Sequence, residues 1–156
     1  MLFSRSLSIT WGEDKRFWHW PSIKLESSTS DDVVVEVAEL LNVCWLEVYG
    51  KLDISYLSPG VKYEVVFLLM LKDHSYGWDV PVNLRLVFPN GATQHQHKVN
   101  LQTRPRSQWV ELHVGEFQTP PNKQEKAEIQ FSMFEYEGGQ WKRGLVIKGV
   151  IIQPKK

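Results

Sequence analysis

Apolar and polar residues alternate with a period of two along much of this 156-residue chain. Val61 to Leu71 carries an apolar residue at every second position, and Val80 to Phe88 repeats the pattern. Alternate side chains of a β-strand point to opposite faces, so this period is typical of strands with one buried face. Asn90-Gly91 follows the second segment and favours a two-residue hairpin turn. The pattern therefore predicts an antiparallel sheet, with a return strand through Thr93 to Leu101.

Other segments of the chain extend this prediction to an all-β fold. Further strands are expected at Leu7–Trp11, Phe17–Ile23, Trp109–Val114, Ala127–Phe134 and Leu145–Gln153. Glu26 to Asp32 and Thr119 to Lys126 are polar or contain proline, which is typical of loops. Only Val33 to Leu41 could form a helix, and it is short and rich in β-branched residues. We predict one domain over residues 1–156, a jelly-roll-like antiparallel β-sandwich with at most one short helix.

Charge and cysteine content narrow the possible functions. Eighteen Lys and Arg balance eighteen Asp and Glu, so the chain lacks the basic excess that nucleic-acid binding usually shows. Cys44 is the only cysteine, so no disulfide can form within the chain. No apolar run is long enough for a signal peptide or a membrane span. We expect a cytoplasmic protein that is not classically secreted and does not enter a membrane.

No motif of a known catalytic type occurs in the sequence, and we predict that the chain is not an enzyme. His95 and His97 lie two residues apart and could bind a metal, but no neighbouring ligand completes the site, so two solvated histidines are the simpler interpretation. Glu128 and Glu135 could form the carboxylate pair of a glycosidase, although a β-sandwich contains many such pairs. Accordingly, no metal and no cofactor is expected.

Tryptophan is over-represented, with seven residues in the chain. In Phe17-Trp18-His19-Trp20, the indoles of Trp18 and Trp20 would share one face of a strand, about 7 Å apart. A flat indole can cover the apolar C–H face of a pyranose ring while polar groups bind the hydroxyls. The cluster, with Trp11 seven residues before Trp18, therefore predicts a sugar-binding platform, although one of its indoles could equally belong to the core.

The four other tryptophans divide by context. Trp45 and Trp109 lie among alternating apolar residues and are predicted to be structural. Trp78 follows Tyr76-Gly77 in a predicted loop, and Trp141 lies just beyond the Gly138-Gly139 turn, so both are second-rank candidates for ligand contact.

Four blocks of sequence lie in order and cover almost the whole chain: Leu7–Trp11 with Phe17–Trp20, Val37–Leu40 with Val43–Val48 and Gly50–Lys51, Trp109–Leu112 with Gly115–Phe117, and Lys142–Val150 with Gln153–Lys155. Together they resemble the phloem protein 2 and tobacco-agglutinin-type lectins (the Nictaba family). Within this family, the short chain without an additional segment most resembles the small cucurbit phloem lectins.

The resemblance implies a jelly-roll lectin, dimeric in several members, that binds chitin oligosaccharides (N-acetylglucosamine oligomers) and the cores of N-glycosylated proteins. The family's two sugar-binding tryptophans correspond to Trp11 and Trp18, and an acidic residue proposed for binding corresponds to Glu135. The remaining candidate contacts are Trp20, Ser22, Tyr136, Trp141 and Lys142. The family's basic nuclear-localisation run has no counterpart here, which favours phloem sap and cytosol.

Three alternatives to a simple lectin remain open. An RNA-binding phloem transport protein could stack bases on the aromatic residues, but the neutral charge provides no phosphate-binding surface. A cross-linking protein could use Cys44 in oxidised sap if the thiol is exposed. A glycosidase would hydrolyse a chromogenic chitobioside. The leading prediction is a homodimeric lectin whose dimer interface the sequence does not locate.

Overall fold

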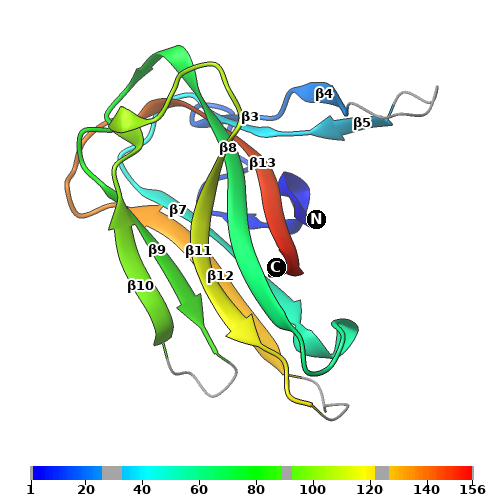
Figure 1. Ribbon diagram of the computed structural model, residues 1–156. Coiled ribbons are helices and arrows are strands. Elements are labelled where there is room, and N and C mark those ends of the chain that lie inside the picture. Colours follow the sequence, from blue (N-terminus) through cyan, green and yellow to red (C-terminus); the bar gives the residue numbers. More distant parts are fainter. Residues whose placement is uncertain (1, 26–32, 89–92, 122–126, 156) are drawn as a thin grey trace.

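The computed structural model describes residues 2–25, 33–88, 93–121 and 127–155, and it confirms the all-β prediction. Two antiparallel sheets pack against each other as a β-sandwich (Figure 1). The six-stranded sheet has the order β11 (Val110–Gln118), β8 (Lys62–Tyr76), β13 (Arg143–Pro154), β6 (Ala38–Leu40) and β3 (Trp18–His19), with β1 (Leu2–Phe3) also paired to β13. The five-stranded sheet has the order β10 (Thr93–Val99), β9 (Val82–Val87), β12 (Glu128–Glu135), β7 (Leu46–Asp53) and β2 (Ser8–Ile9).

A separate two-stranded ribbon, β4 (Ser22–Leu25) with β5 (Val33–Glu36), extends away from the sandwich (Figure 1). The helix considered for Val33 to Leu41 is not formed, because that segment forms β5 and β6 instead. Three consecutive β-branched valines favour extended backbone, and both strands find antiparallel partners. The described helical segments are single 3-10 turns at Ser4–Ser6, Ile54–Tyr56 and Leu101–Thr103, and none is long and apolar enough to cross a membrane.

The predicted hairpin is confirmed by its two strands. β9 and β10 pair antiparallel, with Val87 opposite Thr93 and Val82 opposite Val99. The Asn90-Gly91 turn itself lies outside the described residues, as do the Glu26–Asp32 loop and residues 122–126 of the second predicted loop.

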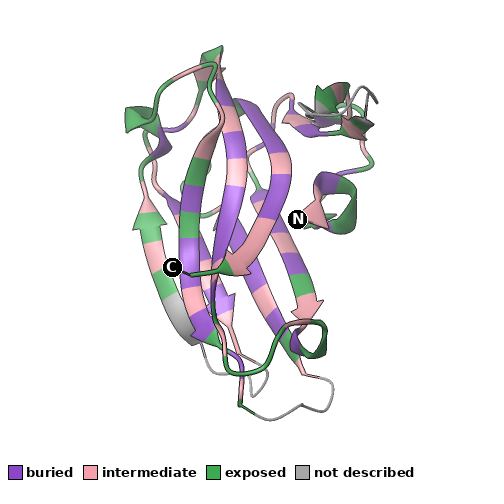
Figure 2. Cartoon of the chain, turned by 45° about the vertical axis from the view of Figure 1, so that its right-hand side comes forward, coloured by how far each residue is buried: buried purple, intermediate pink, exposed green. Residues whose placement is uncertain are grey.

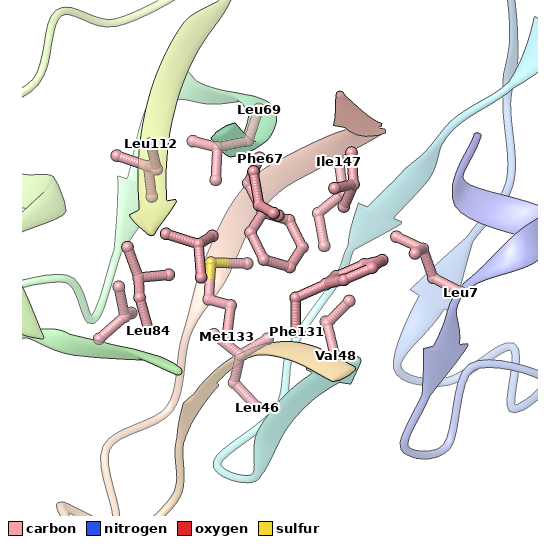
Figure 3. Close-up of a cluster of buried hydrophobic side chains, with 14 of the residues drawn as sticks. Leu7, Leu46, Val48, Phe67, Leu69, Leu84, Leu112, Phe131, Met133 and Ile147 are labelled. Atoms are coloured by element: carbon pink, nitrogen blue, oxygen red, sulfur yellow. The ribbon is translucent and has the colours of Figure 1, made fainter. Parts of the chain in front are cut away.

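The core lies between the two sheets and follows the period of two seen in the sequence. Buried and partly exposed residues alternate along the long strands (Figure 2). Side chains from the inner faces of both sheets point toward one another (Figure 3), and the rings of Phe67 on β8 and Phe131 on β12 meet edge to face at 6.3 Å. Because both rings are fully buried, they join the sheets through apolar contact.

Replacing Phe131 by alanine should remove the largest side chain that the five-stranded sheet contributes to this contact. We expect the free energy of unfolding, measured by urea denaturation, to fall by about 3–5 kcal/mol because a cavity remains in a close-packed core. Val34→Ala, on the exposed side of β5, should change it by about 0.5 kcal/mol or less. A Phe131→Ala effect as small as that of the control would contradict this account of the core.

Candidate functional site

Exposed aromatic side chains gather at one end of the sandwich, the end at which β7, β9 and β13 begin. Six large hydrophobic side chains are exposed among the described residues, and four of them lie in or beside the connections at this end: Trp11, Trp45, Tyr76 and Trp141. We call this region the loop-bearing end; it comprises residues 10–17, 41–45, 76–81 and 136–142. Backbone hydrogen bonds tie these connections together, from Leu41 N to the Phe17 carbonyl (2.8 Å) and reciprocally between Val43 and Lys142.

Trp11 presents the most open indole of the N-terminal connection. Its backbone has a φ of 59°, in the left-handed region that a bulky residue adopts only when surrounding contacts hold it there. Two turns supply those contacts, because Gly12 N donates to the Ile9 carbonyl (2.9 Å) and Asp14 N donates to the Trp11 carbonyl (3.0 Å). The indole packs on Phe17 at 5.5 Å and still leaves Trp11 51% exposed, which makes it a supported, accessible apolar surface.

Trp20 holds the same connection from its other side. Its indole N–H donates to the Gly12 carbonyl (2.8 Å), and the guanidinium of Arg5 lies 3.8 Å from the centre of its ring. Arg5 in turn pairs with Glu13 (3.1 Å) and Glu36 (2.5 Å). Trp20 is therefore half-buried beneath a cation instead of offering a free face to solvent.

Two cavities adjoin these side chains and share four wall residues. One has a volume of about 290 Å³ and the other about 430 Å³. The shared residues are Arg5, Gly12, Glu13 and Trp20; Leu7, Ile9 and Trp11 complete the first wall, and Lys15, Trp18 and His19 complete the second. Apolar rings thus adjoin several charged and polar side chains, a combination that suits a small polar ligand with apolar faces.

The predicted pairing of Trp18 with Trp20 as an exposed platform is wrong. Trp18 is only 2% exposed and packs in the core, while Trp20 follows the end of β3 and is covered by Arg5. The two-residue strand is too short to carry the expected alternation, because its pairing with β6 stops at His19 opposite Glu39 and does not include Trp20. Ser22 is exposed on β4, beyond this cluster.

A buried ion pair lies beneath the other connections of the loop-bearing end. The Lys142 ammonium is fully buried and lies 3.2 Å from the Glu135 Oε1 atom. It also donates to the carbonyls of Cys44 (2.8 Å) and Gln140 (3.1 Å), while Glu135 Oε2 accepts from Gly138 N (3.3 Å). Both residues are predicted ligand contacts, and both are buried. Their ion pair and hydrogen bonds join the chain around Cys44 to residues 138–142.

Comparisons with known proteins identify the family of this chain. The family model for phloem protein 2 matches residues 1–154. The chain belongs to the phloem protein 2 family. It is 50% identical to phloem protein 2-like A1 of Arabidopsis thaliana over 100% of this chain and 61% of that protein. It is 41% identical to a lectin of Luffa acutangula, again over 100% of this chain and over 70% of that protein.

This chain spans 61% of the length of the first of these relatives, which is therefore the longer protein. Among solved structures, a carbohydrate-binding module, TmCBM61 in complex with β-1,4-galactotriose, covers 96% of this chain and 87% of its own, with 15% identity and a TM-score of 0.48. Similarity at this level carries no inference about the ligand.

The structure differs from the predictions for two of the other tryptophans, Trp45 and Trp78. Trp45, expected in the core, is 39% exposed and stacks on Tyr136, with ring centres 4.1 Å apart and an interplanar angle of 10°. Trp78, expected as a loop contact, is fully buried and donates its indole N–H to the Arg143 carbonyl (3.0 Å). Trp141 is 53% exposed, as expected for a loop residue.

Three further features of the sequence acquire a physical interpretation. Glu128 and Glu135 occupy opposite ends of β12, roughly 23 Å apart at about 3.3 Å per residue, whereas a glycosidase pair requires about 5–10 Å. They therefore cannot form the glycosidase pair considered as an alternative. The described residues contain no group of three metal-ligating side chains, and the side chain of His95 lies outside them. Cys44 is a free, half-buried thiol.

A larger cavity, about 610 Å³, is lined by Lys62 of β8, by Phe88 and by five residues of β11. Its charged groups already have partners within the chain: Glu116 pairs with Lys62 (3.3 Å), and His113 Nε2 lies 3.5 Å from Glu64. Because it offers neither exposed tryptophan nor unpaired charge, we place the candidate site at the loop-bearing end despite the smaller cavities there.

Removing the buried cation should destabilise the loop-bearing end. Lys142→Met leaves the Glu135 carboxylate buried without its cation, and we expect the free energy of unfolding in urea to fall by about 3–5 kcal/mol. The double variant Lys142→Met/Glu135→Gln removes both charges and should lose less than the single variant. A single variant within about 1 kcal/mol of the unchanged protein would show that the pair does not support the fold.

Asp14 should titrate at an unusually low pH. Hydrogen bonds from Arg16, above all from its side chain, lower the pKa of this carboxyl from 3.8 to about 2. A lowered folded-state pKa means that the contribution to stability is present above about pH 4 and is lost as the pH falls toward 2. We expect a carboxyl ¹³C NMR titration midpoint near 2 for Asp14. Arg16→Gln should move this midpoint toward 3.8, and an unchanged midpoint would contradict the assignment.

Proposed function

We propose that this chain is a lectin that binds oligomers of N-acetylglucosamine at the loop-bearing end. The observation that carries the proposal is Trp11, an exposed indole supported by Phe17 and held in a left-handed turn beside the two cavities. A pyranose ring placed on this indole would bury one apolar face, a contact that contributes about 1–2 kcal/mol. A relative named as a lectin, 41% identical over the whole chain, supports the same class of ligand.

Polar side chains around the cavities supply the contacts that hydroxyl and acetamido groups need. Arg5 and Glu13 line both cavities, and Lys15 and His19 line the larger of the two. In this proposal Arg5 and Glu13 bind sugar hydroxyls, while their ion pair keeps both groups oriented before the ligand arrives. Trp20 acts mainly as a wall, since its N–H holds the Gly12 carbonyl.

The buried candidates have supporting roles in this proposal. Trp18 supports the connection from the core side and forms part of the wall of the larger cavity. Glu135 and Lys142 fix residues 136–142 through their ion pair, which positions Tyr136 and Trp141 at the surface. They are positioning residues, whereas Trp11 contacts the sugar directly.

Binding would occur without chemistry on the ligand, with chitin oligosaccharides and the cores of N-glycosylated proteins as partners. The names of the phloem relatives support a role in phloem. A homodimer would place two such sites on one particle and allow it to cross-link glycans.

Calorimetric titration with chitotriose tests the proposal. We expect micromolar binding by the unchanged protein and a loss of about tenfold or more in Trp11→Ala, because the indole contact is removed while the fold is retained. Tyr56→Ala is a matched control: Tyr56 is 82% exposed and lies beyond the far end of β7, so its loss should not alter binding.

Absence of binding by the unchanged protein would refute the proposed ligand class, and equal binding by Trp11→Ala would move the site elsewhere. Trp18→Ala is a poor test, because emptying a fully packed core position should cost about 3–5 kcal/mol of stability. Hydrolysis of a chromogenic chitobioside would contradict a purely binding role.

A further inference from the structure

We propose that Trp45 forms a second stacking subsite for the same oligosaccharide, and that Glu47 positions its indole. The inference rests on the proposed function. It adds a sugar-contacting residue on β7, outside the N-terminal connection that carries Trp11, and it implies that affinity depends on the length of the oligosaccharide.

The indole of Trp45 is accessible and also supported from behind. One face stacks on Tyr136, so the 39% of the residue that remains exposed lies away from that contact. Tyr136 stacks in turn on Phe134, with ring centres 5.6 Å apart, and the guanidinium of Arg85 lies 4.6 Å from the Phe134 ring. A row of three planar groups therefore supports the exposed indole, and little side-chain freedom is left to lose when a ligand binds.

Glu47 links the indole of Trp45 to the N-terminal segment that carries Trp11. Its Oε1 atom accepts one hydrogen bond from Trp45 Nε1 (3.2 Å) and another from Thr10 Oγ1 (2.7 Å). The backbone repeats the link, because Thr10 N donates to the Glu47 carbonyl (3.0 Å). Since Trp11 follows Thr10 directly, both exposed indoles are anchored through one residue, and their separation is set before a ligand arrives.

The charges attached to the row favour a neutral ligand over a nucleic acid. Glu47 binds Trp45, Glu137 follows Tyr136, and Arg85 covers Phe134, so carboxylates outnumber cations. Lys142, the other cation nearby, is fully buried and paired with Glu135. Phosphate groups would meet net negative charge here, whereas the C–H face of a pyranose would meet an open indole.

The test compares chitobiose with chitotetraose by calorimetric titration. If Trp45 contacts additional sugar units, the unchanged protein should bind the tetrasaccharide more tightly than the disaccharide. Trp45→Ala should then bind the tetrasaccharide about tenfold more weakly, with the disaccharide affinity unchanged. Tyr56→Ala should retain both affinities, because this residue lies beyond the other end of β7.

A pair of variants at Glu47 separates positioning from direct contact. Glu47→Gln keeps a side-chain oxygen that can accept from both Thr10 and Trp45, and its length dependence should match that of the unchanged protein. Glu47→Met removes the acceptor and should lose most of the tetrasaccharide gain. Urea unfolding of each variant shows whether a change in affinity merely follows a change in stability.

Each outcome bears on one proposal or the other. No binding of either sugar by the unchanged protein would remove the proposed function, and this inference with it. If Trp45→Ala still binds the tetrasaccharide more tightly than the disaccharide by the same factor, the second subsite is overturned and the proposed function stays intact. If Trp45→Ala loses equal affinity for both sugars, Trp45 belongs to the primary site, and the second subsite is again overturned. If Trp45→Ala does not fold, the Trp45 indole N–H resonance of the unchanged protein decides: it should shift with chitotetraose and remain in place with chitobiose, and any other pattern overturns the inference.

Discussion

The ion pair between Lys142 and Glu135 is the interaction on which the loop-bearing end depends. A buried ammonium is costly unless it is paired, and here the Lys142 Nζ atom lies 3.2 Å from Glu135 Oε1 and donates to the carbonyls of Cys44 and Gln140. The two carbonyls belong to the connections that precede β7 and β13, strands of different sheets, and Glu135 is the last residue of β12. One cation therefore joins the two layers of the sandwich at the edge where their hydrophobic contact ends, and the aromatic side chains above it acquire defined positions.

The aromatic residues divide their work between this support and the surface. Trp18 and Trp78 fill the interior, and Trp20 braces a turn through its N–H and its contact with Arg5. Within the described part of the chain, Trp11 and Trp45 are the two exposed indoles that pack against another aromatic ring. A platform for a sugar needs such backing, because an unsupported side chain loses rotational freedom on binding and gives up part of the contact energy.

Much of the fold could be predicted because its cause is local. The alternation in β8 and β9 reports directly which side chains face the core, and both segments are strands with the expected inward residues. The segment Val33 to Leu41 is ambiguous between helix and strand, since nine residues with three successive valines fit neither period clearly. Pairing with β4 and β3 makes both parts of the segment strands, and the paired residues lie 8–14 positions apart for β4 and 20–22 positions apart for β3.

The all-β class, the family and the abundance of indoles can be inferred from the amino-acid sequence, because periodicity, ordered motifs and composition are properties of the chain alone. Which indoles are accessible depends on how the chain packs in three dimensions. Trp18 and Trp45 both sit in apolar, strand-like surroundings, yet the first is packed between strands and the second lies just before β7, where the sheet no longer covers it. Burial depends on which distant segments pack over a residue, such as Arg5 over Trp20, and residue spacing along the chain does not encode that contact.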